Sequence, residues 1–159
     1  MSEAGARAQS TLDSAGPNLD AAWHFRVTDH FTIQPWKRFA VQAVALYDKI
    51  HFGGPDSDNR WISVGARPVF FFNDRFSMAL EAGIDWAKSD PLGTSGHLWK
   101  VTFVPLEISR GEKFFSRPQL RAYITYAGWS DDFKGLVGGT PYADDTRGLS
   151  YGIQAEAWW

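Results

Sequence analysis

The chain ends on the stretch Ser150-Tyr151-Gly152-Ile153-Gln154-Ala155-Glu156-Ala157-Trp158-Trp159. Its odd-numbered positions are all apolar, whereas its even-numbered positions carry Ser, Gly, Gln, Glu and a single Trp. Successive side chains of a β-strand point to opposite faces. The stretch therefore predicts a strand with one apolar face and one largely polar face.

The same alternation recurs upstream of this stretch. In residues 76–86, the even positions are Phe, Met, Leu, Ala, Ile and Trp, and polar residues and glycine occupy most odd positions. Residues 118–126 alternate in the same way, and no segment shows the spacing of an amphipathic helix. We predict strands at 19–28, 31–48, 60–72, 75–88, 97–109, 114–128 and 149–159, preceded by a loop at 1–18 that is rich in Ala, Ser and Gly.

Short and long connections alternate along the chain. Tight turns are predicted at 28–31, 73–76 and 110–113, and longer polar stretches at 48–59, 88–96 and 130–148. This order is typical of an antiparallel up-and-down transmembrane β-barrel, with short periplasmic turns and longer external loops. The carboxylates of the loops at Asp56, Asp58, Asp144 and Asp145 lack the glycine turn and closing glutamate of a calcium loop.

The composition supports this class and excludes others. Aromatic residues make up 16% of the 159 residues, and barrels place such rings at both membrane interfaces. The chain has no cysteine, and its formal charge of −2 gives no reason to expect a nucleic-acid partner. The sequence has neither an apolar run long enough for a membrane helix nor a nucleophile, zinc or phosphate-loop motif. We therefore expect no enzyme activity, cofactor or metal.

Two stretches resemble maltoporins and related carbohydrate porins. The residues Phe114-Phe115-Ser116-Arg117-Pro118-Gln119-Leu120-Arg121-Ala122-Tyr123, followed by Thr125-Tyr126-Ala127-Gly128-Trp129, resemble that family's penultimate strand. Residues 151–159 resemble its final strand and the C-terminal sorting signal of outer-membrane barrels, and Lys100-Val101-Thr102 fits the strand before. The resemblance implies an outer-membrane homotrimer of eighteen-stranded barrels that passes sugars of the maltodextrin type. Seven strands cannot close such a barrel, so we expect residues 19–159 to be its C-terminal part and the chain to be a fragment.

The resemblance also implies which residues contact the sugar. Trp158 and Phe115 match aromatic positions on which the pyranose rings stack. The alternative for Trp158 is a ring at the membrane interface, like Trp159, and the alternative for Phe115 is a buried ring near a turn. Strand parity places Arg117, Arg121 and Glu156 beside these rings, where they would exchange hydrogen bonds with sugar hydroxyls. Parity also turns Arg67, Glu81 and Asp85 inward, as part of a salt-bridged wall. The implied partners are the oligosaccharide, the outer-membrane lipid and the assembly machinery that reads the terminal strand.

Three other interpretations fit parts of the pattern. A complete eight-stranded barrel with a structural or adhesive role needs a further strand in residues 1–18, a segment poor in β-branched residues. An outer-membrane barrel enzyme needs a histidine clustered with a serine or carboxylate on one rim, and the four histidines are scattered singly. A soluble carbohydrate-binding β-sandwich would show the same alternation, with its apolar faces packed together.

Overall fold

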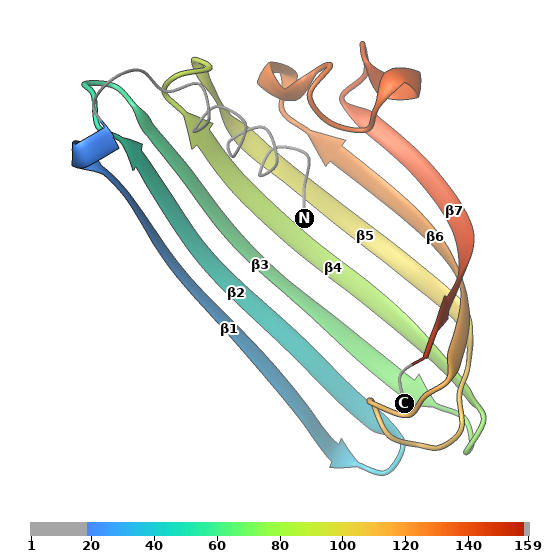
Figure 1. Cartoon of the computed structure of the whole chain (residues 1–159). Coiled ribbons are helices and arrows are strands. Elements are labelled where there is room, and N and C mark those ends of the chain that lie inside the picture. Colours follow the sequence, from blue (N-terminus) through green and yellow to red (C-terminus); the bar gives the residue numbers. More distant parts are fainter. Residues whose placement is uncertain (1–18, 158–159) are drawn as a thin grey trace.

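Seven strands form one antiparallel sheet in chain order in the computed structural model, which describes residues 19–157 (Figure 1). The strands are β1 (Ala22–Trp36), β2 (Phe39–Phe52), β3 (Asp58–Phe71), β4 (Phe76–Ser89), β5 (Thr94–Ile108), β6 (Gln119–Trp129) and β7 (Arg147–Glu156). Short 3-10 turns lie at Leu19–Ala21, Asp131–Phe133 and Thr140–Tyr142. The fold is all-β with up-and-down connectivity, as the sequence predicts.

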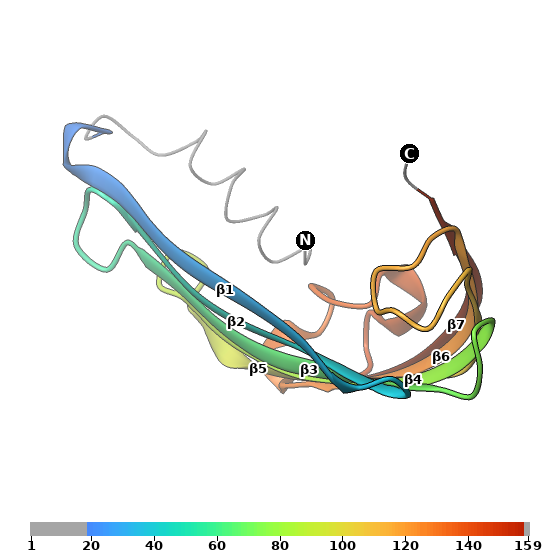
Figure 2. The same cartoon turned by 90° about the horizontal axis from the view of Figure 1, so that it is seen from below.

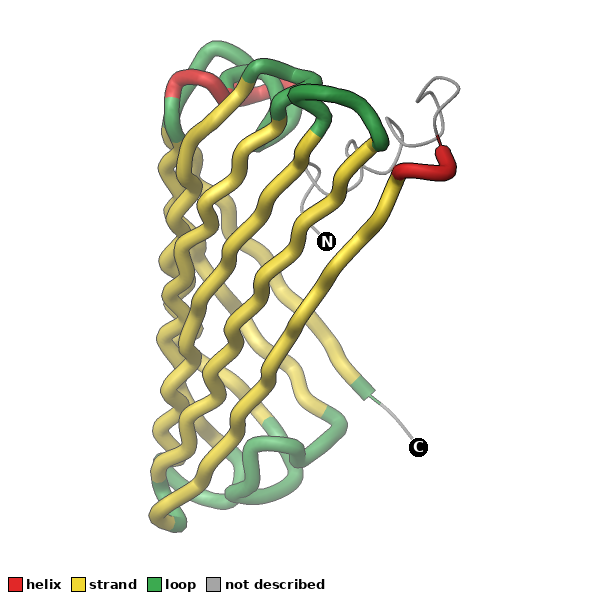
Figure 3. Tube along the Cα trace, turned by 90° about the vertical axis from the view of Figure 1, so that its left-hand side faces the viewer, coloured by secondary structure: helices red, strands yellow, loops and turns green. Residues whose placement is uncertain are grey.

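The sheet is strongly curved and has two different faces. Figure 2 shows the concave side, where the connections after β5 and β6 fold inward, and Figure 3 shows the long tilted strands. The convex face carries most of the exposed large apolar side chains, among them Leu80 (46% exposed) and Ile153 (77% exposed). At 3.2–3.4 Å per residue, a strand of 15 residues such as β1 is about 50 Å long and exceeds the bilayer core.

The apolar convex face has no protein layer over it in the described residues. A β-sandwich would need a second sheet there, and the described strands form only one. β1 and β7 are not hydrogen-bonded to each other, so this sheet is open. The further strand of the small-barrel interpretation would fall in residues 1–18, outside the described residues. No helix in residues 19–157 is long and apolar enough to cross a membrane.

The first predicted turn is wrong. Residues 28–31 continue through β1, which pairs without interruption from Ala22↔Phe52 to Ile33↔Val41, and the chain reverses at residues 37–38. The strand continues because all four residues pair with β2, with Thr28 and His30 on the concave face and Asp29 and Phe31 on the convex face. The turn after β3 is confirmed: the Asn73 Oδ1 accepts the backbone N–H groups of Arg75 and Phe76, at 2.9 and 3.0 Å.

The predicted loop lengths also need correction. Most of the polar stretches at 48–59 and 88–96 is strand, which leaves connections only at 53–57 and 90–93. Cross-strand ion pairs, such as that between the Lys49 Nζ and the Asp58 Oδ2 at 2.7 Å, keep these polar strand ends paired. Conversely, the strand predicted to begin at residue 114 begins at Gln119, and residues 109–118 form an extended connection. We call the end of the sheet with connections 53–57, 90–93 and 130–146 the long-loop end, and the other the short-turn end.

Neighbouring residues in the middle of β3 test the assignment of the two faces. We expect Val64→Arg, on the exposed convex face, to destabilise the protein in lipid by about 2–4 kcal/mol, because the charge would enter hydrocarbon. Ser63→Arg, on the concave face, is the matched control and should cost much less. Urea unfolding in lipid vesicles measures both values, and equal losses would contradict the assignment.

Candidate functional site

The connection 109–118 crosses the concave side of the sheet and contacts the opposite edge. The Gln34 Nε2, from β1, donates to the carbonyl oxygen of Glu112 at 2.6 Å, and the backbone N–H of Phe114 donates to the Gln34 Oε1 at 3.4 Å. The Lys37 Nζ lies 2.9 Å from the Glu112 Oε2. These contacts join residues far apart in the sequence and position the connection inside the curve, where Figure 2 shows it.

Phe114 anchors the same connection on a small apolar cluster. The cluster lies at the short-turn end of the concave face and comprises Ala40, Val69, Phe71, Ala79 and Val104, with Phe114 and Tyr123 packed against it. The Arg67 guanidinium also lies over the Phe114 ring, 5.7 Å from its centroid, which adds a cation–π attraction. Phe114 is therefore partly buried, whereas the neighbouring ring is exposed.

Phe115 is that neighbouring ring, and it is 59% exposed. Its centroid lies 5.0 Å from that of Phe114, with the two planes at 79°, so one ring supports the other edge to face. Phe115 and Arg117 both lie in the connection 109–118, so the prediction that they share one face of a strand is wrong.

Three of the predicted site residues come together beside this connection. The Glu156 Oε2, on β7, lies 3.0 Å from the Arg117 Nη2 and 3.3 Å from the Arg121 Nη2. The Arg117 Nη1 also donates to the carbonyl oxygens of Phe114 and Ser116, and the Arg121 Nε donates to the Gln154 Oε1 at 3.1 Å. The side chain of Arg117 is only 7% exposed, so its hydrogen bonds hold the connection against β7.

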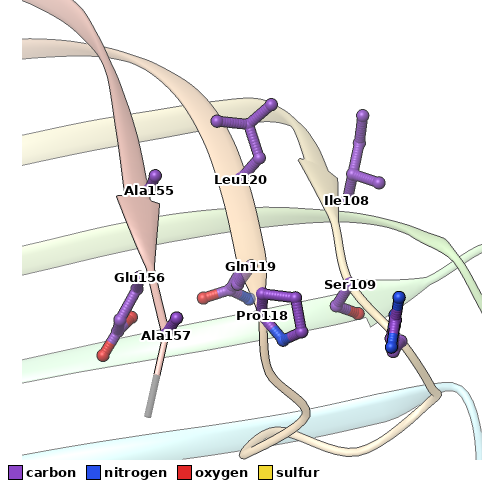
Figure 4. A pocket seen from close by; sticks show the side chains of 9 residues that line it. Ile108, Ser109, Pro118, Gln119, Leu120, Ala155, Glu156 and Ala157 are labelled. Atoms are coloured by element: carbon purple, nitrogen blue, oxygen red, sulfur yellow. The ribbon is translucent and has the colours of Figure 1, made fainter.

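A pocket lies next to this ion-pair group at the short-turn end. Its volume is about 420 Å³, and its lining residues come from both faces of the sheet: Ile108, Leu120 and Ala155 from the convex face, and Gln119 and Glu156 from the concave face (Figure 4). Trp158, the other predicted stacking residue, lies outside the described residues.

A buried ion pair lies behind the connection. The Arg67 Nη2 is 2.7 Å from the Glu107 Oε2, and the Ser77 Oγ donates to the Glu107 Oε1 at 3.0 Å. The Glu107 side chain is only 3% exposed. Arg67 is among the predicted wall residues, whereas Glu107 is not, because a register irregularity in β5 between Phe103 and Leu106 shifts the face on which Glu107 lies.

The rest of the concave wall is also polar and paired. Glu81 meets the Lys100 Nζ at 3.5 Å, and the Asp85 Oδ1 accepts from the Trp61 Nε1 at 3.1 Å, so both predicted wall residues face inward. Near the long-loop end, His24 and Arg26 both contact the buried carboxylate of Asp48. Trp61 is not among the predicted wall residues, although it lies six residues before Arg67 on β3 and therefore on the same strand face. Residues 19–157 contain no cluster of His, Asp or Glu suited to a metal ion.

One comparison with known proteins bears on this site. The family model described as LamB porin matches residues 1–159. The match therefore covers both the concave wall and the connection 109–118.

Removing one partner of the buried ion pair tests its role. We expect Glu107→Leu to destabilise the protein by about 3–5 kcal/mol, because it leaves the Arg67 charge buried without its carboxylate. The double variant Arg67→Met with Glu107→Leu should recover most of that loss. Unfolding midpoints in detergent give the comparison, and a double variant no more stable than Glu107→Leu would count against the ion pair.

Proposed function

We propose, from the premise that the chain belongs to the LamB porin family, that its concave face lines a channel for passive diffusion of maltodextrin-type sugars. The family is one of outer-membrane carbohydrate porins, so the membrane location and the general class of cargo follow from membership. The choice of maltodextrins and the route along particular side chains are our proposals.

The observation that carries the proposal is the pairing of an exposed aromatic ring with a polar wall. Phe115 projects from a connection on the concave side, and Arg121, Gln154 and Glu156 lie beside the base of that connection. A pyranose offers an apolar face for stacking and a rim of hydroxyl groups for hydrogen bonding. A ring next to donors and acceptors suits both at once.

The polar residues divide into two roles in this proposal. Arg117 is almost buried, so we assign it to positioning the connection, although its guanidinium also contacts Glu156. Arg121 and Glu156 lie at 13% and 32% side-chain exposure, which leaves Glu156 the more accessible group for hydroxyl donors. We propose that Trp158 supplies a second stacking ring, because it follows Glu156 by two residues in the sequence.

Closure of the channel requires strands beyond the open edges of this sheet. Unpaired backbone groups of β1 and β7 in hydrocarbon would be costly, so we propose that further strands pair with both edges. The proposed assembly is a homotrimer of eighteen-stranded barrels, with the long-loop end outside the cell. We propose further that the assembly machinery reads β7 and the terminal aromatic residues.

Replacing the exposed ring tests the stacking role. We expect Phe115→Ala in the full-length protein to weaken maltohexaose block of ion conductance about threefold to tenfold, because aromatic contacts contribute about 0.5–1.5 kcal/mol. Phe72→Ala, which removes an exposed ring from the β3–β4 turn at the same end, is the control and should leave the block unchanged. If maltohexaose blocks the Phe115→Ala variant as strongly as it blocks the wild type, the stacking role of Phe115 is contradicted.

The two terminal tryptophans separate transport from assembly. Trp158→Ala should weaken the same conductance block while the protein still reaches the outer membrane. Trp159→Ala should instead reduce the amount of folded protein in outer-membrane fractions, measured by heat-dependent gel migration. Unchanged sugar block in the first variant would remove Trp158 from the proposed route, and normal assembly of the second would contradict the sorting role.

A further inference from the structure

Three basic residues lie side by side on the convex face near the long-loop end. The register pairs Lys49 on β2 with Arg60 on β3, and Arg60 with Lys88 on β4. Adjacent strands are 4.7–4.9 Å apart, so the row extends for about 10 Å across the sheet. Like charges directly opposite each other are unfavourable in a sheet, and such a row calls for a counter-charge.

The protein provides part of that counter-charge. The Lys49 Nζ lies 2.7 Å from the Asp58 Oδ2, and the Lys88 Nζ lies 2.8 Å from the Asp90 Oδ1. The hydrogen bond from Lys88 holds the pKa of the Asp90 carboxyl below its usual value, so Asp90 is charged at neutral pH. Arg60, in the middle of the row, has no ion pair within residues 19–157.

The row lies next to the apolar band of the convex face. Two residues further toward the middle of the same strands, the register aligns Tyr47, Ile62 and Trp86, and the next level holds Ala45, Val64 and Ile84. Rings such as Tyr and Trp favour the lipid–water interface. The basic row therefore lies at the depth of lipid headgroups, on the side that faces lipid.

We propose that Lys49, Arg60 and Lys88 bind the phosphate of a phosphorylated lipid headgroup, with Arg60 as the central contact. The guanidinium fork matches two phosphate oxygens, and the flanking lysines supply point charges. A lipid suits the surface better than free phosphate does, because its acyl chains would lie on the apolar band directly beside the row. This site is separate from sugar conduction and uses the opposite face of the sheet.

The test measures lipid binding to the full-length protein in detergent micelles by native mass spectrometry. The probe is lipid A carrying two phosphates, compared with lipid A from which both have been removed. We expect Arg60→Gln to weaken binding of the phosphorylated form about tenfold, since it removes a charge-assisted contact. Arg60→Lys should fall between this variant and wild type, because it keeps the charge and loses the fork.

Matched controls distinguish this site from general attraction to charge. Arg75→Gln removes an exposed arginine from the turn at 72–75, at the other end of the sheet, and should not change binding. The proposal is overturned if Arg60→Gln binds as wild type does, if Arg75→Gln loses as much, or if the dephosphorylated lipid binds equally well. Full displacement by inorganic phosphate would identify a free-anion site instead and would also overturn it.

The variants also keep this inference separate from the proposed transport function. Heat-dependent gel migration confirms that each variant is folded before binding is measured. Maltohexaose block of conductance should be the same in Arg60→Gln and wild type, because the concave face is untouched. If Phe115→Ala leaves sugar block unchanged while Arg60→Gln weakens lipid binding, the transport proposal fails and the lipid site stands.

Discussion

A strand that crosses hydrocarbon must give every backbone N–H and C=O group a partner inside the sheet. In this protein the antiparallel pairing of β1 to β7 meets most of that requirement. Register irregularities interrupt it between β1 and β2, β4 and β5, and β5 and β6, and the outer sides of β1 and β7 are unpaired in the sheet. The same register fixes which residues share a face, since side chains alternate along each strand. One pattern of backbone hydrogen bonds therefore determines both which side chains face lipid and which side chains form the polar concave face.

The concave wall contains buried charged side chains, and each of them has a partner of opposite charge. Glu107 lies almost fully buried, yet it contacts both Arg67 and Ser77, and Asp48 is similarly surrounded by His24 and Arg26. A buried charge is costly when it lacks a partner, so these pairs allow a polar wall without loss of the fold. Residues in such pairs hold the wall in place, and Glu156, which pairs with both Arg117 and Arg121, is the most exposed of its group at 32%.

The alternation made the strands and their faces predictable, and the Asn73 turn was predictable because its side chain caps its own backbone. Two features could not be predicted from the sequence. The polar pattern at 28–31 resembles a turn locally, but long-range pairing with β2 keeps those residues in strand. The inward course of residues 109–118 depends on Gln34, far away in the sequence, and on burial of Phe114. Local spacing carries no information about either contact, so Phe115 and Arg117 were assigned to the wrong element.

The bond from Gln34 to the connection 109–118 spans the curve from β1 to the β5–β6 hairpin. The curve is therefore held by the two hydrogen bonds of Gln34 to this connection as well as by the pairing of neighbouring strands. Because Phe115 lies in the connection, the position of this exposed ring depends on an amide side chain from the far edge of the sheet. Loss of Gln34 would displace the ring while leaving the strand pairing intact.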